Sequence, residues 1–204
     1  VSAHSDNIYM DARLFERVKA VYDGREAMNY TVEQTRLLEK VYNAFVRNGI
    51  SLPEAEQARM REINAELSTL QQKFGNNLLA ETNAFKLVLE SEEDLAGLPE
   101  AVRTAAAEAA KAEGLEGKWV IGLQNPSRIP FLQYSERRDL REKVYKAYIE
   151  RGNNGNENDN KEIVLQIMKL RIEKANLLGF ETSADFILDD TMAKTSDVVN
   201  SFLL

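Results

Sequence analysis

The sequence has no cysteine and a single histidine, His4. Without cysteine, disulfides, thiolate catalysis, iron–sulfur clusters and cysteine-based zinc sites are all excluded. A catalytic zinc site usually takes two or three histidines, or two histidines and a carboxylate, so one histidine is too few. We expect the end that holds His4 to be mobile, which argues against a serine–histidine–aspartate triad. The 204 residues are therefore predicted to contain no catalytic residue and no metal ligand.

Long hydrophobic runs and an excess of positive charge are also missing. No stretch approaches the roughly 18 consecutive apolar residues that a transmembrane helix needs. The 33 acidic and 26 basic side chains give a net charge of -7, which argues against generic nucleic-acid binding and against an anionic membrane surface. What is present, 44% apolar and 29% charged residues, suffices for a folded chain with a sizeable core.

Apolar residues recur at helical spacing through the first part of the chain. Asp11 is a candidate N-cap for a helix that ends at Gly24. Thr31 and Gln34 form a capping-box pattern before a second helix, which ends at Gly49. Each helix carries an apolar stripe, so we expect both to pack on one face.

The longest predicted helix opens at Ser51 and Pro53. A coiled-coil dimer seam and one face of an intramolecular antiparallel pair both fit its apolar stripe. Clean heptads are too few for a convincing coiled coil, so we favour the intramolecular pair. The stripe consists of Met60, Ile63, Leu67, Leu70 and Phe74.

The period changes in the middle of the chain, where two short strands are predicted at about residues 86–90 and 118–123. We expect them to pair as a small antiparallel ribbon. A turn at 95–99 and an alanine-rich helix from Glu100 to Glu113 lie between them. Pro126 and Pro130 predict breaks after the second strand.

The last third is again predicted to be helical. Ser135 is the expected cap of a helix whose inward residues are Leu140, Val144, Ala147 and Tyr148. A loop over 151–160, a helix over 160–178, a shorter helix within 183–192 and a helix begun after a Thr195 cap follow. The predicted fold class is mainly α, an antiparallel, bundle-like lobe with a small two-stranded β element. Because no internal repeat or strong boundary is present, 1–204 is expected to be a single helical portion.

Both ends suggest a longer protein. The chain starts at Val1 rather than at a methionine, and its last apolar residues fall within a helix just begun. We expect the chain to be an internal piece of something larger.

The asparagine-rich loop invites comparison with a calcium-binding EF-hand. Placing Gly155 at the sixth position of such a loop puts Gly152 at a ligand position. The same alignment puts Lys161 where a bidentate glutamate belongs. The prediction is therefore a solvated loop.

Three further groups of side chains could carry chemistry. The pairs Glu92/Glu93 and Asp189/Asp190 suggest paired carboxylates, but adjacent residues do not face one another, so solvated surface is expected. An arginine cluster could bind a substrate carboxylate, although i,i+4 pairing such as Arg138 with Glu142 is commoner. We expect the tyrosines to be core or half-buried packing residues. The arginines are Arg137, Arg138 and Arg141, and the tyrosines are Tyr134, Tyr145 and Tyr148.

Several segments, in order from about residue 4 to 204, together resemble the M3 family of zinc metallopeptidases. The likeness is greatest to the peptidyl-dipeptidase branch, with oligopeptidase A and thimet oligopeptidase as relatives. Each segment alone is weak evidence for the resemblance, whereas the order and spacing of the segments together are fairly specific for the family. The segments are residues 4–10, 14–22, 74–79, 95–99, 126–132, 140–145, 170–175, 177–180 and 192–194.

The resemblance implies a large, nearly all-helical, two-lobed parent enzyme with a deep channel. The family binds zinc through His-Glu-x-x-His and a later glutamate, and the first glutamate activates a zinc-bound water. This sequence lacks that motif, so no catalytic or metal residue can be transferred, and its substrate-binding residues stay unknown. The expected role is a channel wall that admits only short peptides. The implied partners are the missing catalytic domain of the same polypeptide and short peptide substrates, with no nucleic acid and no membrane.

Two alternatives stay open. The parent could be an oligopeptidase that cuts internally instead of releasing C-terminal dipeptides. The chain could also be a self-contained helical interaction module without an enzymatic parent. The cytoplasm is the expected compartment, and the periplasm remains possible.

Overall fold

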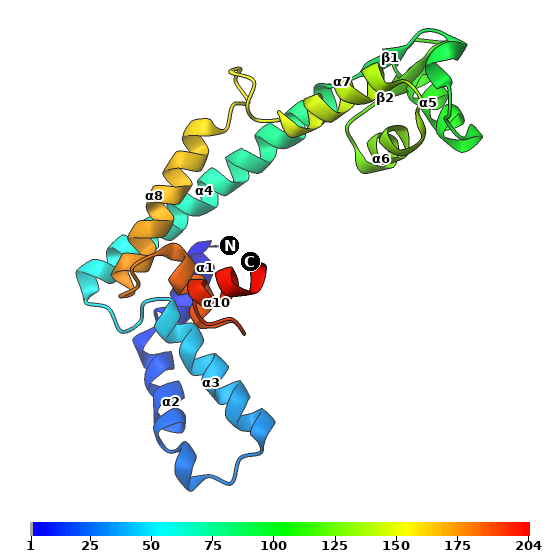
Figure 1. Ribbon diagram of the computed structural model, residues 1–204. Coiled ribbons are helices and arrows are strands. Elements are labelled where there is room, and N and C mark those ends of the chain that lie inside the picture. The colour runs from blue at the N-terminus through cyan, green and yellow to red at the C-terminus, as the bar shows by residue number, and fades with distance from the viewer. Residues whose placement is uncertain (1) are drawn as a thin grey trace. The chain divides into compact units, whose positions relative to one another are not determined.

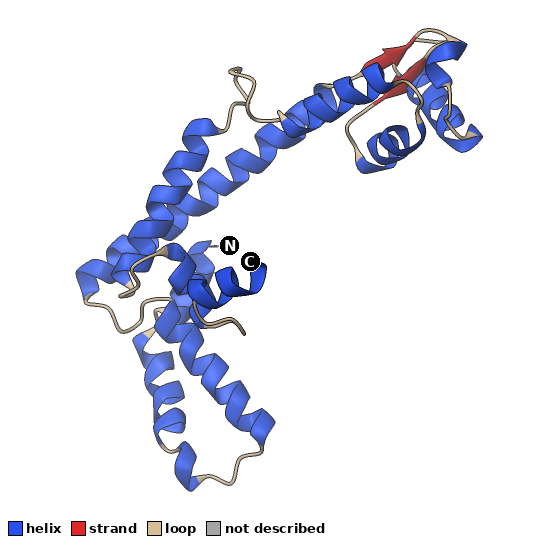
Figure 2. Cartoon of the chain, in the orientation of Figure 1, coloured by secondary structure: helices blue, strands red, loops and turns tan. Residues whose placement is uncertain are grey.

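The computed structural model describes residues 2–204. More than half of these residues lie in α-helices, and two short strands pair with each other, which confirms the mainly α prediction (Figures 1 and 2). The chain divides into two compact units. Unit 1 holds the residues up to Gln71 together with Leu165–Leu204, and unit 2 is Gln72–Val164.

The division between the units passes through two helices, α4 (Glu54–Ala84) and α8 (Lys161–Leu177). Because both helices continue across it, the division coincides with no loop, and the sequence shows no boundary there. That residues 1–204 act as one portion of a larger enzyme stays a prediction.

Unit 1 contains a helical hairpin whose two predicted caps are confirmed. Asp11 accepts a hydrogen bond from the Leu14 backbone N–H at 3.0 Å. Thr31 and Gln34 form the complete capping box, with bonds of 3.2 and 2.9 Å. The helices of this unit, besides its parts of α4 and α8, are α1 (Ser2–Tyr9), α2 (Ala12–Asp23), η1 (Arg25–Ala27), α3 (Val32–Arg47), α9 (Ser183–Asp189) and α10 (Ser196–Leu203).

Helix α1 is a finding that the sequence analysis missed. The structure places His4 on this helix, exposed to solvent, where a mobile end was expected. Two anchors explain the order of this segment. Met10, directly after α1, is buried in a cluster with Phe45, Ile50 and Met60. Asp6 is also buried and accepts a hydrogen bond from Asn64 Nδ2 at 2.8 Å.

The apolar stripe of α4 packs within the chain. Met60, Ile63 and Leu67 are all buried inside unit 1. Beside them, Arg59 binds both carboxylate oxygens of Glu173 on α8, at 2.6 and 2.9 Å. This packing supports the intramolecular interpretation over a dimer seam.

Unit 2 is built around the two-stranded sheet. Strands β1 (Leu87–Leu89) and β2 (Trp119–Ile121) run antiparallel, with Val88 opposite Val120. Around them lie η2 (Glu92–Leu95), α5 (Glu100–Ala112), α6 (Asn125–Tyr134) and α7 (Arg138–Ile149). The buried side chains of this core are Leu89, Leu95, Leu98, Ala106, Ile121, Leu123, Phe131, Leu140 and Val144.

The predicted chain breaks at Pro126 and Pro130, between β2 and α7, are wrong. Both prolines lie within α6. Pro126 occupies the first turn, where its missing N–H costs nothing, and Pro130 removes only one backbone bond of a short helix anchored by the fully buried Phe131.

Ser135 does not cap α7, which begins at Arg138. Its backbone already closes α6, because its N–H donates to the Phe131 carbonyl at 3.0 Å. Its hydroxyl accepts a bond from the Arg137 N–H at 3.2 Å, inside the connection between the two helices.

Candidate functional site

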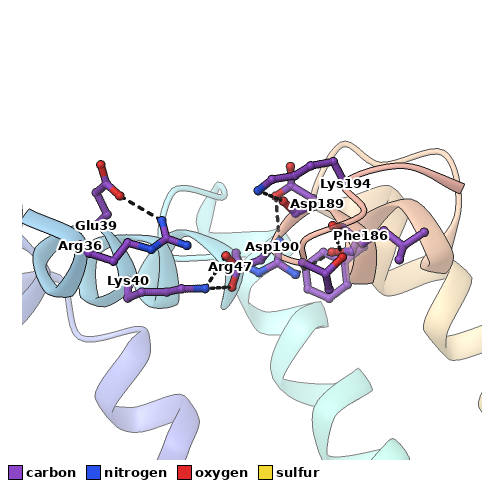
Figure 3. A network of polar contacts seen from close by, with 10 residues as sticks. Arg36, Glu39, Lys40, Arg47, Phe186, Asp189, Asp190 and Lys194 are labelled. Carbon is purple, nitrogen blue, oxygen red and sulfur yellow. Dashed lines mark hydrogen bonds and ion pairs between the residues drawn. The ribbon is translucent and has the colours of Figure 1, made fainter. Parts of the chain in front are cut away.

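The structure brings Asp189 and Asp190 to the side of α3, where each carboxylate forms an ion pair with a different basic side chain (Figure 3). Lys40 Nζ donates to both oxygens of Asp190 at 2.7 and 2.8 Å. Arg47 Nη1 donates to Asp189 Oδ2 at 3.0 Å. The Lys40 hydrogen bond lowers the pKa of the Asp190 carboxyl below its usual range. Two carboxylates that each pair with a basic side chain of their own are not arranged to share a proton as an acid–base pair.

Arg47 also fixes α9, the helix that ends at Asp189. Its Nη2 donates to the Phe186 carbonyl at 2.6 Å, and its guanidinium carbon lies 4.3 Å from the centre of the Phe186 ring. Lys194 Nζ donates to the Asp189 carbonyl at 2.9 Å. The contacts together attach α9 and the turn after it to α3, which is a structural role. A cavity of about 370 Å³ beside them is lined by Arg36, Asn43, Val46, Arg47, Leu178, Phe180, Asp189, Asp190 and Lys194.

The arginine cluster at the start of α7 is largely occupied by groups of the protein itself. Arg137 binds Asp139 through two nitrogens, at 3.1 and 2.9 Å, and also pairs with Asp94. Arg141 donates to the Ser135 carbonyl. Arg137 is therefore already neutralised by two carboxylates, which leaves it poorly suited to hold a substrate carboxylate.

Glu142, the predicted i,i+4 partner of Arg138, forms its ion pair with another residue. Glu142 pairs with Lys146 at 2.6 Å, which has the same i,i+4 spacing in the other direction. This order, with the glutamate nearer the N-terminus, is the more favourable one on a helix. Arg138 instead lines a shallow pocket of about 380 Å³ together with Leu132, Arg141, Glu142 and Tyr145.

The three tyrosines differ in environment. Tyr134 and Tyr145 are 46% and 54% exposed, so the expectation that they are core or half-buried packing residues is wrong. Tyr148 is half-buried, as expected, with two guanidinium groups near its ring. The guanidinium carbons of Arg128 and Arg151 lie 3.5 and 3.9 Å from the ring centre. Tyr148 thus contributes cation–π contacts as well as packing.

The asparagine-rich loop is not simply solvated, because it closes around the buried carboxylate of Glu81. Oε2 of Glu81 accepts bonds from the Gly152 N–H at 2.6 Å and from Asn154 at 2.9 Å. Oε1 accepts one from Asn156 at 2.8 Å. Burial alone would raise the pKa of Glu81, but these three hydrogen bonds lower it below its ordinary value.

Asn160 closes the same loop from its other end. It is 3% exposed, and its side chain accepts a bond from Asn77 at 2.9 Å and donates to the Phe74 carbonyl at 3.2 Å. Hydrogen bonds from Lys161 and Gly155 lower the pKa of Asp159 to about 2. The side-chain oxygens of Asp159 and Asn160 are therefore engaged by N–H groups of the chain.

A second polar network, in unit 1, was also not predicted from the sequence, and it includes the buried Asp6 and the half-buried Lys174. Lys174 Nζ donates to Asn64 Oδ1 at 2.7 Å, and Asn64 in turn binds Asp6. Burial lowers the pKa of Lys174, and the nearby Asp6 charge partly opposes this shift. No local pattern signals either network, because their partners are far apart in sequence, 71 residues for Glu81 with Gly152 and 110 for Lys174 with Asn64.

Neither a metal cluster nor a membrane-spanning helix is found in the part of the chain that the structure describes. Within residues 2–204, no three histidine, aspartate or glutamate side chains are grouped so as to hold a metal ion. None of the described helices is both long and apolar enough to cross a bilayer. Glu92 and Glu93 lie exposed on η2. That the chain contains no catalytic residue stays a prediction.

Sequence comparison adds what the geometry leaves open. Residues 131–204 match the model of peptidase family M3. Over 199 residues, 98% of the chain, the sequence is 35% identical to a dipeptidyl carboxypeptidase of Escherichia coli strain K12. The chain is a relative of the M3 peptidases. It is also 36% identical over its whole length to an oligopeptidase A of Haemophilus influenzae, and 33% identical over 88% of its length to a probable cytosolic oligopeptidase A of Arabidopsis thaliana.

The chain spans only part of these M3 relatives. It covers 29% of the Escherichia coli protein, 30% of the Haemophilus influenzae protein and 26% of the Arabidopsis thaliana protein. More than two thirds of each relative therefore has no counterpart in this sequence.

Proposed function

We propose that residues 1–204 are a non-catalytic helical portion of a longer M3-type zinc metallopeptidase. The observation that carries this proposal is similarity over 98% of the chain to a peptidase of which the chain covers only 29%. The catalytic domain, with its His-Glu-x-x-His motif, would belong to the remaining polypeptide. The residues present do not fit a zinc site, because the sequence has one histidine and the described residues form no metal-binding cluster.

In the parent enzyme, the role of this portion is architectural. Its packed helices would form part of a channel wall that excludes folded proteins and admits short, extended peptides. The ion pairs of Arg59 with Glu173 and of Lys40 with Asp190 support a fixed wall, because they tie together helices far apart in sequence. The cytoplasm is the proposed compartment, with the periplasm as the alternative.

The proposed reaction of the parent is release of C-terminal dipeptides from short peptides. Support comes from the relative named dipeptidyl carboxypeptidase. The relatives named oligopeptidase A support the alternative, cleavage inside short peptides. A free C-terminal carboxylate distinguishes the two, since only a peptidyl-dipeptidase needs to bind it.

The test starts with the coding DNA beyond Leu204. We expect a long continuous frame that encodes His-Glu-x-x-His. The complete protein and residues 1–204 are then assayed on one peptide with a free and with an amidated C-terminus. We expect zinc-dependent dipeptide release by the complete protein from the free peptide only, and no turnover by residues 1–204.

Three results would contradict parts of this proposal. Zinc-dependent turnover by residues 1–204 would place the catalytic site inside them. A stop codon just after Leu204 would favour a self-contained helical interaction module, for which the exposed apolar side chains of α2 and α3 are the supporting observation. Equal cleavage of the free and amidated peptides would favour the oligopeptidase alternative.

A further inference from the structure

The hairpin of α2 and α3 in unit 1 leaves one apolar face open. Leu37, Val21 and Val41 on this face are 65%, 48% and 38% exposed. They belong to a groove of about 450 Å³, which we call the hairpin groove. Its lining is Arg17, Val18, Val21, Tyr30, Gln34, Leu37, Leu38 and Val41.

The aromatic side chains that join α2 to α3 are different from the residues that line the hairpin groove. Tyr22 stacks on Tyr42 with ring centres 3.9 Å apart, and Phe15 lies 5.6 Å from Phe45. None of these four rings lines the hairpin groove. The groove residues are therefore additional to the aromatic contacts that join α2 to α3, and contiguous apolar surface of this kind usually marks an interaction site.

We propose that an amphipathic helix from the part of the parent polypeptide outside residues 1–204 occupies the hairpin groove. This inference rests on the proposed function, which supplies that polypeptide. The relatives make such a segment available, since the chain covers only 29–30% of two of them. A segment of the same chain also binds at a high effective concentration, so a shallow groove suffices to hold it.

The charge of the groove lining also indicates which residues the occupying helix should carry. The only charged residue in the lining is Arg17. The occupying helix should therefore present apolar residues at i, i+3 and i+4 spacing, with an acidic residue beside Arg17. A second copy of this chain is a poorer occupant, because each copy carries a net charge of -7 and the copies repel each other.

Cysteine labelling tests the proposal directly, because the chain has no cysteine of its own. Leu37→Cys places a thiol in the hairpin groove. Ala20→Cys, exposed on α2 and outside the lining, is the matched control. Each substitution is made in residues 1–204 and in the complete parent, and reaction with N-ethylmaleimide is followed at that peptide by mass spectrometry.

In residues 1–204 both thiols should react at similar rates. In the parent, the Leu37→Cys thiol should react at least about tenfold more slowly, while the Ala20→Cys thiol changes by less than about twofold, because only the covered site must open to react. Should Leu37→Cys impair folding, judged by circular dichroism, Val21→Cys replaces it.

The outcomes separate this proposal from the one it rests on. Unchanged labelling of Leu37→Cys in a parent that cleaves peptides would overturn the groove proposal alone. Labelling of residues 1–204 that slows as protein concentration rises would assign the groove to a second copy and would also overturn it. A reading frame that stops near Leu204 would overturn both proposals.

Discussion

The sheet-containing core of unit 2 and the α2–α3 hairpin of unit 1 bury their apolar residues to very different extents. In the core, Leu89, Ile121 and Phe131 are at most 1% exposed. In the hairpin helices, Phe45 is the only buried residue described. Both regions carry regular apolar patterns, so pattern alone does not determine whether a face is covered.

The difference follows from how many elements converge. In unit 2, two strands and several helices surround one cluster, so each apolar side chain meets neighbours on more than one side. Two helices on their own share a single contact line and leave much of each stripe uncovered. An uncovered stripe on a well-capped hairpin therefore points to a missing neighbour and not to a weak helix.

Truncation in the core of unit 2 should have the largest effect. Phe131→Ala removes a fully buried ring and should lower the free energy of unfolding by about 3–5 kcal/mol, because a cavity is left behind. Urea denaturation followed by circular dichroism measures this. A loss below about 1 kcal/mol would mean that the core collapses around the gap, and would weaken the contrast with the hairpin.

The buried carboxylate of the asparagine-rich loop should come second. Glu81→Ala leaves the donors of Gly152, Asn154 and Asn156 without their acceptor. Of these three donor residues only Gly152 is buried, and one unfilled buried donor costs about 1–3 kcal/mol in unfolding free energy, also measurable by urea denaturation. The control is Glu157→Ala, an exposed residue of the same loop, which should be near neutral.

Glu81 should also make stability depend on pH. Its pKa is lower in the folded chain than its ordinary value, so the stabilisation is fully present above the unfolded pKa, about 4.3. It is lost as the pH falls through the lower, folded pKa. The unfolding free energies of the original chain and of Glu81→Gln are compared between neutral and acid pH, and the variant should lose less stability in acid. If the unfolding free energies of the two proteins change equally with pH, the Glu81 carboxylate is not a source of the acid sensitivity.

Loss of the hairpin's capping box should have a smaller effect. Thr31→Ala removes the hydroxyl that accepts from the Gln34 N–H and should lower the unfolding free energy by about 1 kcal/mol. Thr31→Ser keeps an acceptor and serves as the control. If both variants lose the same stability, the methyl group matters and the cap does not.

The smallest effect is expected in the hairpin groove. Leu37 is 65% exposed, so Leu37→Ala in residues 1–204 should change the unfolding free energy by less than about 0.5 kcal/mol. The same substitution in the complete parent should cost more, because the side chain is then covered. A large loss in residues 1–204 would show that the hairpin is already covered there and would remove the contrast with the core of unit 2.

Local features were predicted well from the sequence. The Asp11 and Thr31 caps, the loop after Arg151 and the end of α8 close to residue 178 follow from residues a few positions apart, and the structure confirms them. The paired strands were also predicted, since their alternation is local. The predictions at Pro130 and Ser135 were wrong, because a buried Phe131 and the closing turn of α6 outweighed the usual preferences of these residues.

The candidate sites were less predictable. Asp189 and Asp190 were correctly expected not to face each other as a pair, but their partners Lys40 and Arg47 lie 150 and 142 residues away along the chain. The burial of Glu81 was not foreseen for the same reason. One sequence without an alignment carries no signal for such pairs.

By itself, the sequence determined the helical character, the caps, the small ribbon and the relation to the M3 peptidases, because each depends on residue types in a fixed order along the chain. Only the tertiary structure decided which apolar stripes are covered, which carboxylates are buried and where the chain divides into two units. These properties depend on which distant segments meet, and burial is a property of that meeting rather than of any one segment.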